Sequence, residues 1–68
     1  MKIYGATTIS NPIYRWESRI TLLEKGDKGC KFQREHKMHN GETFFLSNDA
    51  FENSHWEEID ENGEFIKN

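Results

Sequence analysis

The sequence contains a single cysteine, a single proline and no valine. One cysteine, Cys30, excludes a disulfide within the chain, and chains without disulfides are typical of the cell interior. No apolar run approaches the roughly 20 residues that a membrane-spanning helix needs. The first five residues also lack the long apolar region of a signal peptide. The sequence therefore predicts a cytoplasmic protein with no membrane partner.

Large apolar side chains are also few. Ile, Leu and Phe make up about a fifth of the 68 residues, close to the roughly 20% below which chains are usually disordered. Aromatic residues account for 13% of the chain and stand in for the missing β-branched valines. A chain of this size has room for one domain, residues 1–68, with one small core. This excludes a multi-domain enzyme and a nucleotide-binding α/β fold.

The charges are distributed unevenly between the two halves of the chain. Residues 1–38 have a net charge of +4 and residues 39–68 a net charge of −7, which together give the overall −3. In a domain this small the two halves lie against each other, so internal complementarity and a solvated acidic surface explain the pattern in one interpretation. In the other, an acidic face attracts a basic partner protein, for example one that normally holds nucleic acid.

Turn signals divide the chain into segments too short for typical helices. Asn11-Pro12 is one such signal, because the residue before proline is pushed out of the helical region, and Lys25–Gly29 is a loop with two glycines. Asn40-Gly41 and Asn62-Gly63 are both typical of two-residue type I′ hairpin turns, in which both central residues have positive φ.

Between the turns the pattern has a period of two, which is typical of strands. Odd positions in residues 30–38 are all polar, which predicts a strand with one solvated face. The short apolar segment 43–47 predicts the most buried strand, although Phe44 and Phe45 cannot both face inward. Residues 48–53 predict the one helical turn, capped by Ser47, Asn48 or Asp49. The remaining expected elements are an arm or first strand within 1–14, a strand at 16–22, and a closing hairpin formed by 56–60 and 64–67, with 61–68 as hairpin or tail.

This pattern resembles an SH3-like small β-barrel. The resemblance covers roughly residues 16–60 and is carried by Asn40–Ser47, Phe51 and Trp56–Ile59. In SH3-like barrels the fourth strand likewise runs through a single helical turn into a short fifth strand. The same residues are similar to several small phage-encoded proteins. The resemblance implies an all-β or β-rich α+β domain, namely a five-stranded barrel with one short helical turn, in the host cytoplasm if phage-encoded. An OB-type barrel and an open α+β sheet are the alternatives.

Residues with metal-binding or catalytic chemistry show no recognisable spacing. Zinc sites are usually formed by paired ligands, and the one pair here, His36-x-x-His39, runs from a predicted strand into a turn. Nucleophilic catalysis needs a nucleophile, a base and an orienting group, and Cys30 has no local signature of that kind. Glu57 and Glu58 are adjacent, so in a strand they point to opposite faces and cannot act as a carboxylate pair. We therefore expect no metal, no cofactor and no enzymatic activity.

The sequence favours a small protein-binding module, an accessory or inhibitor protein that occludes a partner protein. Its predicted binding surface combines acidic and aromatic residues: Asp49, Glu52, Trp56, Glu57, Glu58, Asp60, Glu61 and Tyr14. One alternative is a single-stranded nucleic-acid binder that uses a basic stretch, Lys28, Lys31, Arg34 and Lys37, although a pI of about 5.5 argues against it. The other alternative is a homo-oligomeric subunit formed by edge-strand pairing. We expect a monomer or a weak homodimer.

Overall fold

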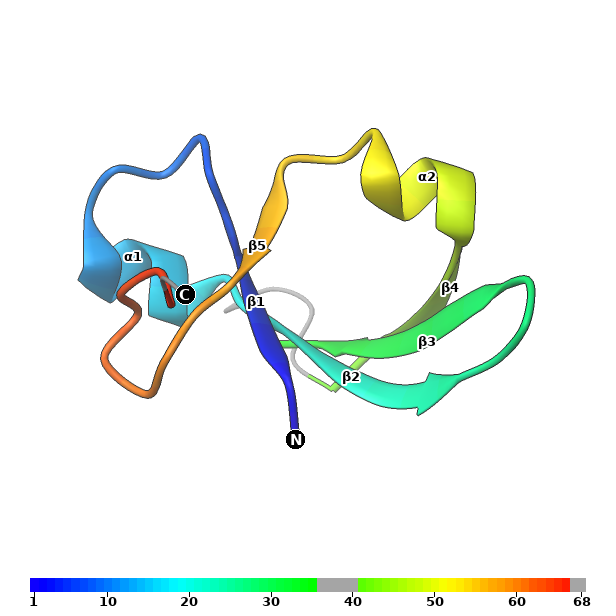
Figure 1. Cartoon of the computed structure of the whole chain (residues 1–68). Helices are drawn as coiled ribbons and strands as arrows, with labels where there is room; N and C mark the ends of the chain where they lie inside the picture. Colours follow the sequence, from blue (N-terminus) through cyan, green and yellow to red (C-terminus); the bar gives the residue numbers. More distant parts are fainter. Residues whose placement is uncertain (36–40, 67–68) are drawn as a thin grey trace.

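Five strands and two short helices follow one another along the chain (Figure 1). The computed structural model describes residues 1–35 and 41–66. The strands are β1 (Ile3–Ala6), β2 (Ile20–Lys25), β3 (Gly29–Arg34), β4 (Thr43–Ser47) and β5 (Trp56–Glu58), and the helices are α1 (Pro12–Glu17) and α2 (Asn48–Glu52). The fold is a small sheet-rich domain, as the sequence predicted.

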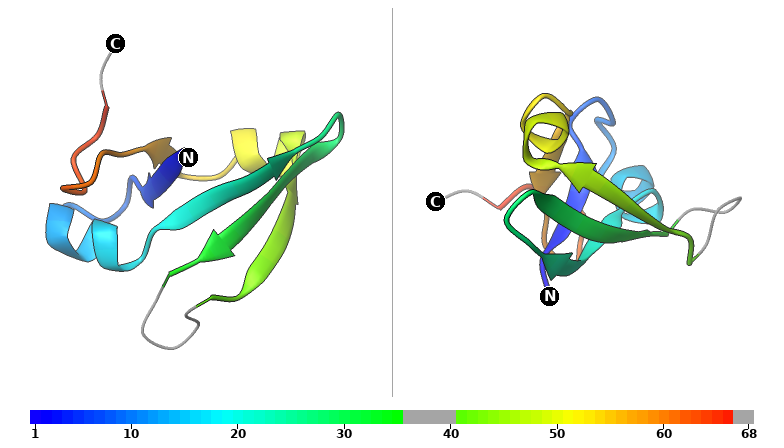
Figure 2. Two further views of the ribbon diagram at one scale, coloured as in Figure 1. Left: turned by 90° about the horizontal axis from the view of Figure 1, so that it is seen from below. Right: turned by 90° about the vertical axis from the view of Figure 1, so that its right-hand side faces the viewer.

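The strands form one antiparallel sheet in the order β4-β3-β2-β1-β5. β4 and β5 are therefore the two edge strands, and within the described residues no strand pairing joins them, so the sheet is not closed. α2 connects β4 to β5 and packs on the curved sheet (Figures 1 and 2). We call the sheet face that α2 covers the inner face and the opposite one the outer face.

Helix α1 replaces the first part of the strand predicted at residues 16–22. Asn11 caps this helix, since its side-chain oxygen accepts a hydrogen bond of 2.9 Å from the Ile13 backbone N–H. Pro12 occupies the first turn, where proline has no intrahelical bond to lose. The prediction of a single helical turn is therefore wrong, because Asn11-Pro12 begins a helix instead of interrupting a strand.

Helix α2 lies where the sequence predicted a helical turn. The Ser47 hydroxyl accepts a hydrogen bond of 3.1 Å from the Ala50 backbone N–H, which is the usual bond of an N-cap serine. This places Phe51 on the inner face, where its ring contacts the rings of Tyr4 and Phe32. The predicted position of this helix and its cap are confirmed.

The β2–β3 hairpin confirms the predicted glycine loop and the predicted alternation. Gly26 N–H donates to the Gly29 carbonyl at 2.8 Å, and β3 follows at once. Phe32 is 1% exposed, whereas its neighbour Lys31 is exposed. The strand predicted to extend to residue 38 is described only to Arg34. Its continuation over residues 36–38 and the turn at Asn40 lie outside the described residues.

The turn after β5 differs from the predicted type I′ hairpin. Gly63 has a φ of 79°, but in the described chain no residue other than glycine has a positive φ, so Asn62 does not meet the type I′ requirement. Asp60 instead accepts from Gly63 N–H and donates its own N–H to Glu64 O, the arrangement of a longer loop that ends in a left-handed glycine. The predicted closing hairpin is reduced to a single bridge between Ile59 and Phe65.

An aromatic cluster fills the inner face. Phe32 stacks on Phe44 with ring centroids 5.8 Å apart and on Phe51 at 5.4 Å, while Tyr4 meets Phe32 and Phe51 edge-on. The prediction that β4 is the most buried strand is wrong, because β4 is an edge strand and Phe45 is 60% exposed on it. Of the adjacent pair, Phe44 faces inward and Phe45 outward.

Candidate protein-interaction surface

Exposed carboxylates lie on α2, on β5 and in the turn that follows. The acidic edge, as we define it, runs from α2 through β5 into the turn that follows (Figure 1). It consists of the predicted acidic residues whose side chains are exposed: Asp49, Glu52, Glu57 and Glu61. These carboxylates come from three consecutive elements, and their negative charges add to one another at long range.

Two predicted members of this surface, Glu58 and Asp60, are half-buried and have contacts within the protein. Glu58 pairs in register with Tyr4 and shares its inner face. Burial and the nearby Glu58 charge, together with Cys30, raise the pKa of the Tyr4 hydroxyl above its ordinary value of 10.0. The Asp60 carboxylate accepts from the backbone N–H groups of Asn62 at 2.8 Å and Glu64 at 3.0 Å. Both side chains therefore have structural contacts and are less exposed than the four carboxylates of the acidic edge.

Trp56, on β5, is half-buried. It pairs in register with Ala6 on β1, so its side chain lies on the inner face. The sequence predicted it as an aromatic anchor because tryptophan is enriched in interfaces, and part of the side chain is exposed.

Tyr14 is the predicted aromatic that the structure leaves exposed. It lies on α1 with 60% of its surface exposed, beside Ile13 at 66%. The helix is held against the turn at the end of the acidic edge, since a side chain on Gly63 would meet the Pro12 carbonyl. Tyr14 and Glu61 are therefore presented by neighbouring segments.

A buried arginine makes this connection between α1 and the turn. Arg15 is only 3% exposed. Its Nε donates to the Gly63 carbonyl at 2.7 Å and its Nη1 to the Ile9 carbonyl at 2.7 Å. The guanidinium also lies 3.9 Å from the centroid of the Phe65 ring, within the range of a cation–π contact. In the sequence, Arg15 contributes only to the +4 net charge of residues 1–38, and no pattern there predicts this role.

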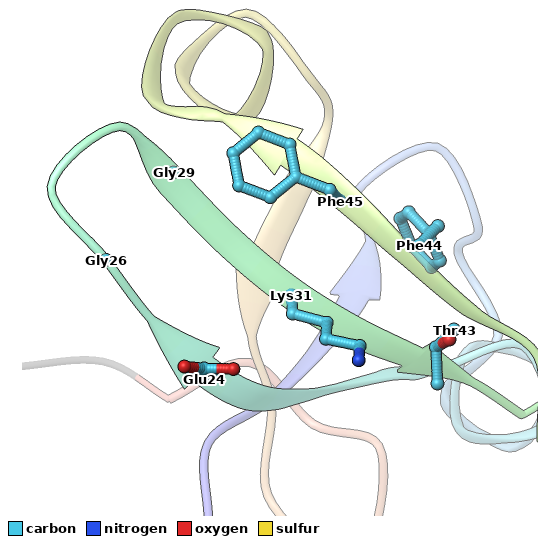
Figure 3. A pocket seen from close by; sticks show the side chains of 7 residues that line it. All are labelled: Glu24, Gly26, Gly29, Lys31, Thr43, Phe44 and Phe45. Atoms are coloured by element: carbon cyan, nitrogen blue, oxygen red, sulfur yellow. The ribbon is translucent and has the colours of Figure 1, made fainter.

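An apolar groove of about 360 Å³ lies on the outer face next to β4 (Figure 3). Phe45 forms one side and leans over β3, so that a side chain on Gly29 would come within 2.6 Å of its ring. Lys31 and Glu24 bring one charge of each sign to the floor from β3 and β2. The sequence predicted that Phe44 and Phe45 do not both face inward, but not that the outward ring borders a groove.

A second groove, also of about 360 Å³, opens on the inner face. Phe32 and Phe51 from the aromatic cluster and the half-buried thiol of Cys30 line it, with Lys2 and Lys25 among its charged residues. The Cys30 side chain therefore lies partly open to this groove.

The fold separates the basic residues proposed for nucleic-acid binding. Lys28 is exposed in the β2–β3 loop and Lys31 on the outer face. Arg34 lies on the inner face, with its guanidinium 5.1 Å from the centroid of the Phe44 ring. Lys37 lies outside the described residues. The predicted basic stretch therefore does not form one surface.

In residues 1–35 and 41–66, no three side chains of His, Cys, Asp or Glu are grouped so as to hold a metal ion. Neither of the two helices described has the length and apolar character needed to cross a membrane.

Comparison with known proteins gives no relative, since no family model, curated protein or solved structure matches the chain. A functional proposal for this chain therefore depends on its own surfaces.

Proposed function

We propose that this chain is a small non-enzymatic protein-binding module that docks on a basic protein surface. Its proposed binding surface is the acidic edge together with Tyr14. The class of function is that of an accessory or inhibitor protein of the phage type, which acts in the cytoplasm by occluding its partner.

One observation carries the proposal: four exposed carboxylates follow one another on α2, β5 and the next turn, and this turn lies beside the exposed Tyr14 helix. Their negative charges attract a basic partner at long range and steer it into place. Tyr14 supplies the kind of amphipathic ring that contributes most to interface affinity. Arg15 links the two parts through its hydrogen bond to Gly63.

The sheet supports an SH3-like barrel as the finer description of the fold. Five strands in one antiparallel sheet, with α2 between β4 and a short β5, are the features that the resemblance implies. Helix α1 and the bridge between Ile59 and Phe65 are additions to that pattern. The proposal concerns the order and connection of these elements, because the described sheet is open between β4 and β5.

A charge-reversal capture experiment tests the function. The tagged protein is exposed to lysate at low salt, and captured proteins are quantified by mass spectrometry for three chains. These are the natural chain, a Glu52→Lys/Glu57→Lys variant of the acidic edge, and a Glu24→Lys/Asp27→Lys control on the exposed β2–β3 hairpin. Both double variants change the net charge equally.

We expect a partner that the natural chain and the control retain, that the acidic-edge variant loses, and that dissociates as salt screens the charges. Tyr14→Ala should weaken the same capture. Equal capture by both double variants, or no captured protein at low salt, would contradict the proposal.

A single-stranded nucleic-acid binder is the second candidate. It is favoured by one observation, the exposed Phe45 ring paired in register with Lys31, because aromatic rings beside basic residues form stacking platforms. Fluorescence anisotropy with a labelled oligonucleotide at two salt concentrations tests it. Binding must weaken steeply with salt and with Lys31→Gln but not with Lys2→Gln. No binding at low salt removes this candidate.

A further inference from the structure

Within residues 1–35 and 41–66, no strand pairs with the side of β4 that faces away from β3, so this side presents backbone groups ready for another strand. Hydrogen bonds mark both ends of its ladder with β3, from Arg34 N–H to Glu42 O at 2.7 Å and from Asn48 N–H to Lys28 O at 3.0 Å. In an antiparallel pair such bonded residues recur at every second position. The residues between them point their backbone N–H and C=O groups away from β3: Thr43, Phe45 and Ser47.

β4 also lacks the features that usually protect an edge strand. Proteins commonly place charges, prolines or bulges on such strands to prevent unwanted pairing. Thr43–Ser47 contains no charge and no proline, and its register with β3 is continuous. The other edge, β5, contains Glu57 and Glu58. The two edges of the same sheet thus differ in whether they repel a second copy.

The sequence of β4 is complementary to itself when reversed. We propose that β4 pairs antiparallel with β4 of a second copy of this chain, with the two-fold axis at Phe45. In this register Phe45 lies opposite Phe45 of the second copy, and Thr43 lies opposite Ser47. Phe44 lies opposite Leu46 on the inner face. Each pair combines like with like, apolar with apolar and hydroxyl with hydroxyl, and such cross-strand pairs stabilise sheets.

The self-complementary sequence of β4 selects a second copy as the occupant, and the charges on β5 limit the assembly to two chains. Each chain has a net charge of −3, so self-association needs an uncharged contact, which β4 supplies. Pairing through β5 would place Glu57 against the same residue of another copy, and like charges directly opposite destabilise a sheet. A two-fold contact through β4 uses each β4 edge once, so it closes as a dimer instead of extending into a fibre.

Sedimentation equilibrium over micromolar to millimolar concentrations tests the proposal with a matched pair of variants. Phe45→Lys places a charge on the pairing edge. Tyr14→Lys makes the same change at a side chain that is equally exposed, at 60%, but lies on α1. We expect the natural chain and Tyr14→Lys to rise in mass with concentration towards a dimer and Phe45→Lys to stay monomeric. A natural chain that stays monomeric at millimolar concentration, or a Phe45→Lys variant that dimerises equally, would overturn the proposal.

Amide exchange of the natural chain gives a second measurement that depends on no variant. The Phe45 N–H should exchange more slowly as the protein concentration rises, because the second copy protects it. The Leu46 N–H, which faces β3, should be protected at every concentration. A Phe45 exchange rate that does not change with concentration would overturn the proposal.

The acidic edge is not part of this contact, so Glu52→Lys/Glu57→Lys should dimerise like the natural chain whether or not it captures a partner.

Discussion

The two sides of β1 are stabilised in opposite ways. Tyr4 points to the inner face and joins a cluster of aromatic rings at centroid distances of 5.1–5.9 Å. Gly5 points to the other side, where a side chain would collide with Arg15 and Ile59. One side thus depends on apolar burial, and the other on a buried cation held by backbone carbonyls.

This difference indicates which substitutions each side of β1 tolerates. Burial of apolar surface has no direction, so a ring can be replaced by another apolar side chain of similar volume at modest cost. The Arg15 contacts depend on the planar fork of the guanidinium, which reaches Gly63 and Ile9 at the same time. We therefore expect the inner face to respond to side-chain volume and the Arg15 side to respond to shape and hydrogen bonding.

Phe32→Ala should have the largest effect, because Phe32 contacts three other rings and is 1% exposed. Truncation of a buried phenylalanine costs about 3–5 kcal/mol, and a folded chain of 68 residues typically has about 3–10 kcal/mol in total. We expect Phe32→Ala to be largely unfolded and Phe32→Leu to fold with reduced stability. Urea denaturation followed by tryptophan fluorescence measures both. A Phe32→Leu variant as unstable as Phe32→Ala would show that volume alone does not govern this face.

Arg15→Met should destabilise the fold by about 2–3 kcal/mol, because it leaves buried carbonyls without donors. Arg15→Lys should recover only part of this loss, since one ammonium cannot reproduce both bonds. Arg19→Met is the control, because Arg19 is only half-buried and its guanidinium lies over the Trp16 ring at 4.0 Å. Urea midpoints of the three variants test the prediction. Full stability in Arg15→Lys would contradict the importance of the planar fork.

Gly5→Ala should cost about 1–3 kcal/mol, the usual range for adding atoms to a well-packed site. The new Cβ would lie 2.5 Å from Arg15 Cγ and 3.1 Å from two carbons of Ile59. Gly26→Ala is the matched control, because its Cβ would meet only one atom, at 3.5 Å. Thermal unfolding of the two variants compares them. A Gly5→Ala variant as stable as Gly26→Ala would show that the Arg15 side is loosely packed.

The sequence predicted the aromatic side of β1 better than the Arg15 side. Period-two alternation identifies Phe32 as inward and predicts that one of Phe44 and Phe45 is exposed, because strand geometry alone decides this. Turn chemistry likewise predicts α2 from Ser47 and its neighbours. Which of the two phenylalanines is inward depends on the register between β3 and β4, and that register is set by contacts distant in sequence.

No sequence pattern predicts the hydrogen bonds of Arg15. Its partners are backbone carbonyls, which every residue has, and the Gly63 carbonyl is 48 positions away. Helix α1 was missed for a related reason: Asn11-Pro12 is equally suited to interrupting a strand and to starting a helix, and a segment of six residues needs tertiary contacts to decide. The exposed part of the acidic edge follows from composition, whereas the inward Glu58 follows only from its pairing with Tyr4.

Tyr4→Phe should have the smallest effect and should appear only at high pH. The pKa of Tyr4 is raised above 10.0 in the folded protein, by burial first and then by the charges of Glu58 and Cys30. As pH rises, Tyr4 therefore ionises in the unfolded chain before it ionises in the folded chain. The stability that the neutral Tyr4 hydroxyl contributes is fully present below pH 10 and is lost as the pH rises through the pKa of Tyr4 in the folded protein. Urea midpoints below and above pH 10 should fall less for Tyr4→Phe than for the natural chain. Tyr14→Phe, at an exposed position, should behave like the natural chain. An equal fall of the urea midpoint in all three proteins would show that ionisation of Tyr4 does not affect the stability of the fold.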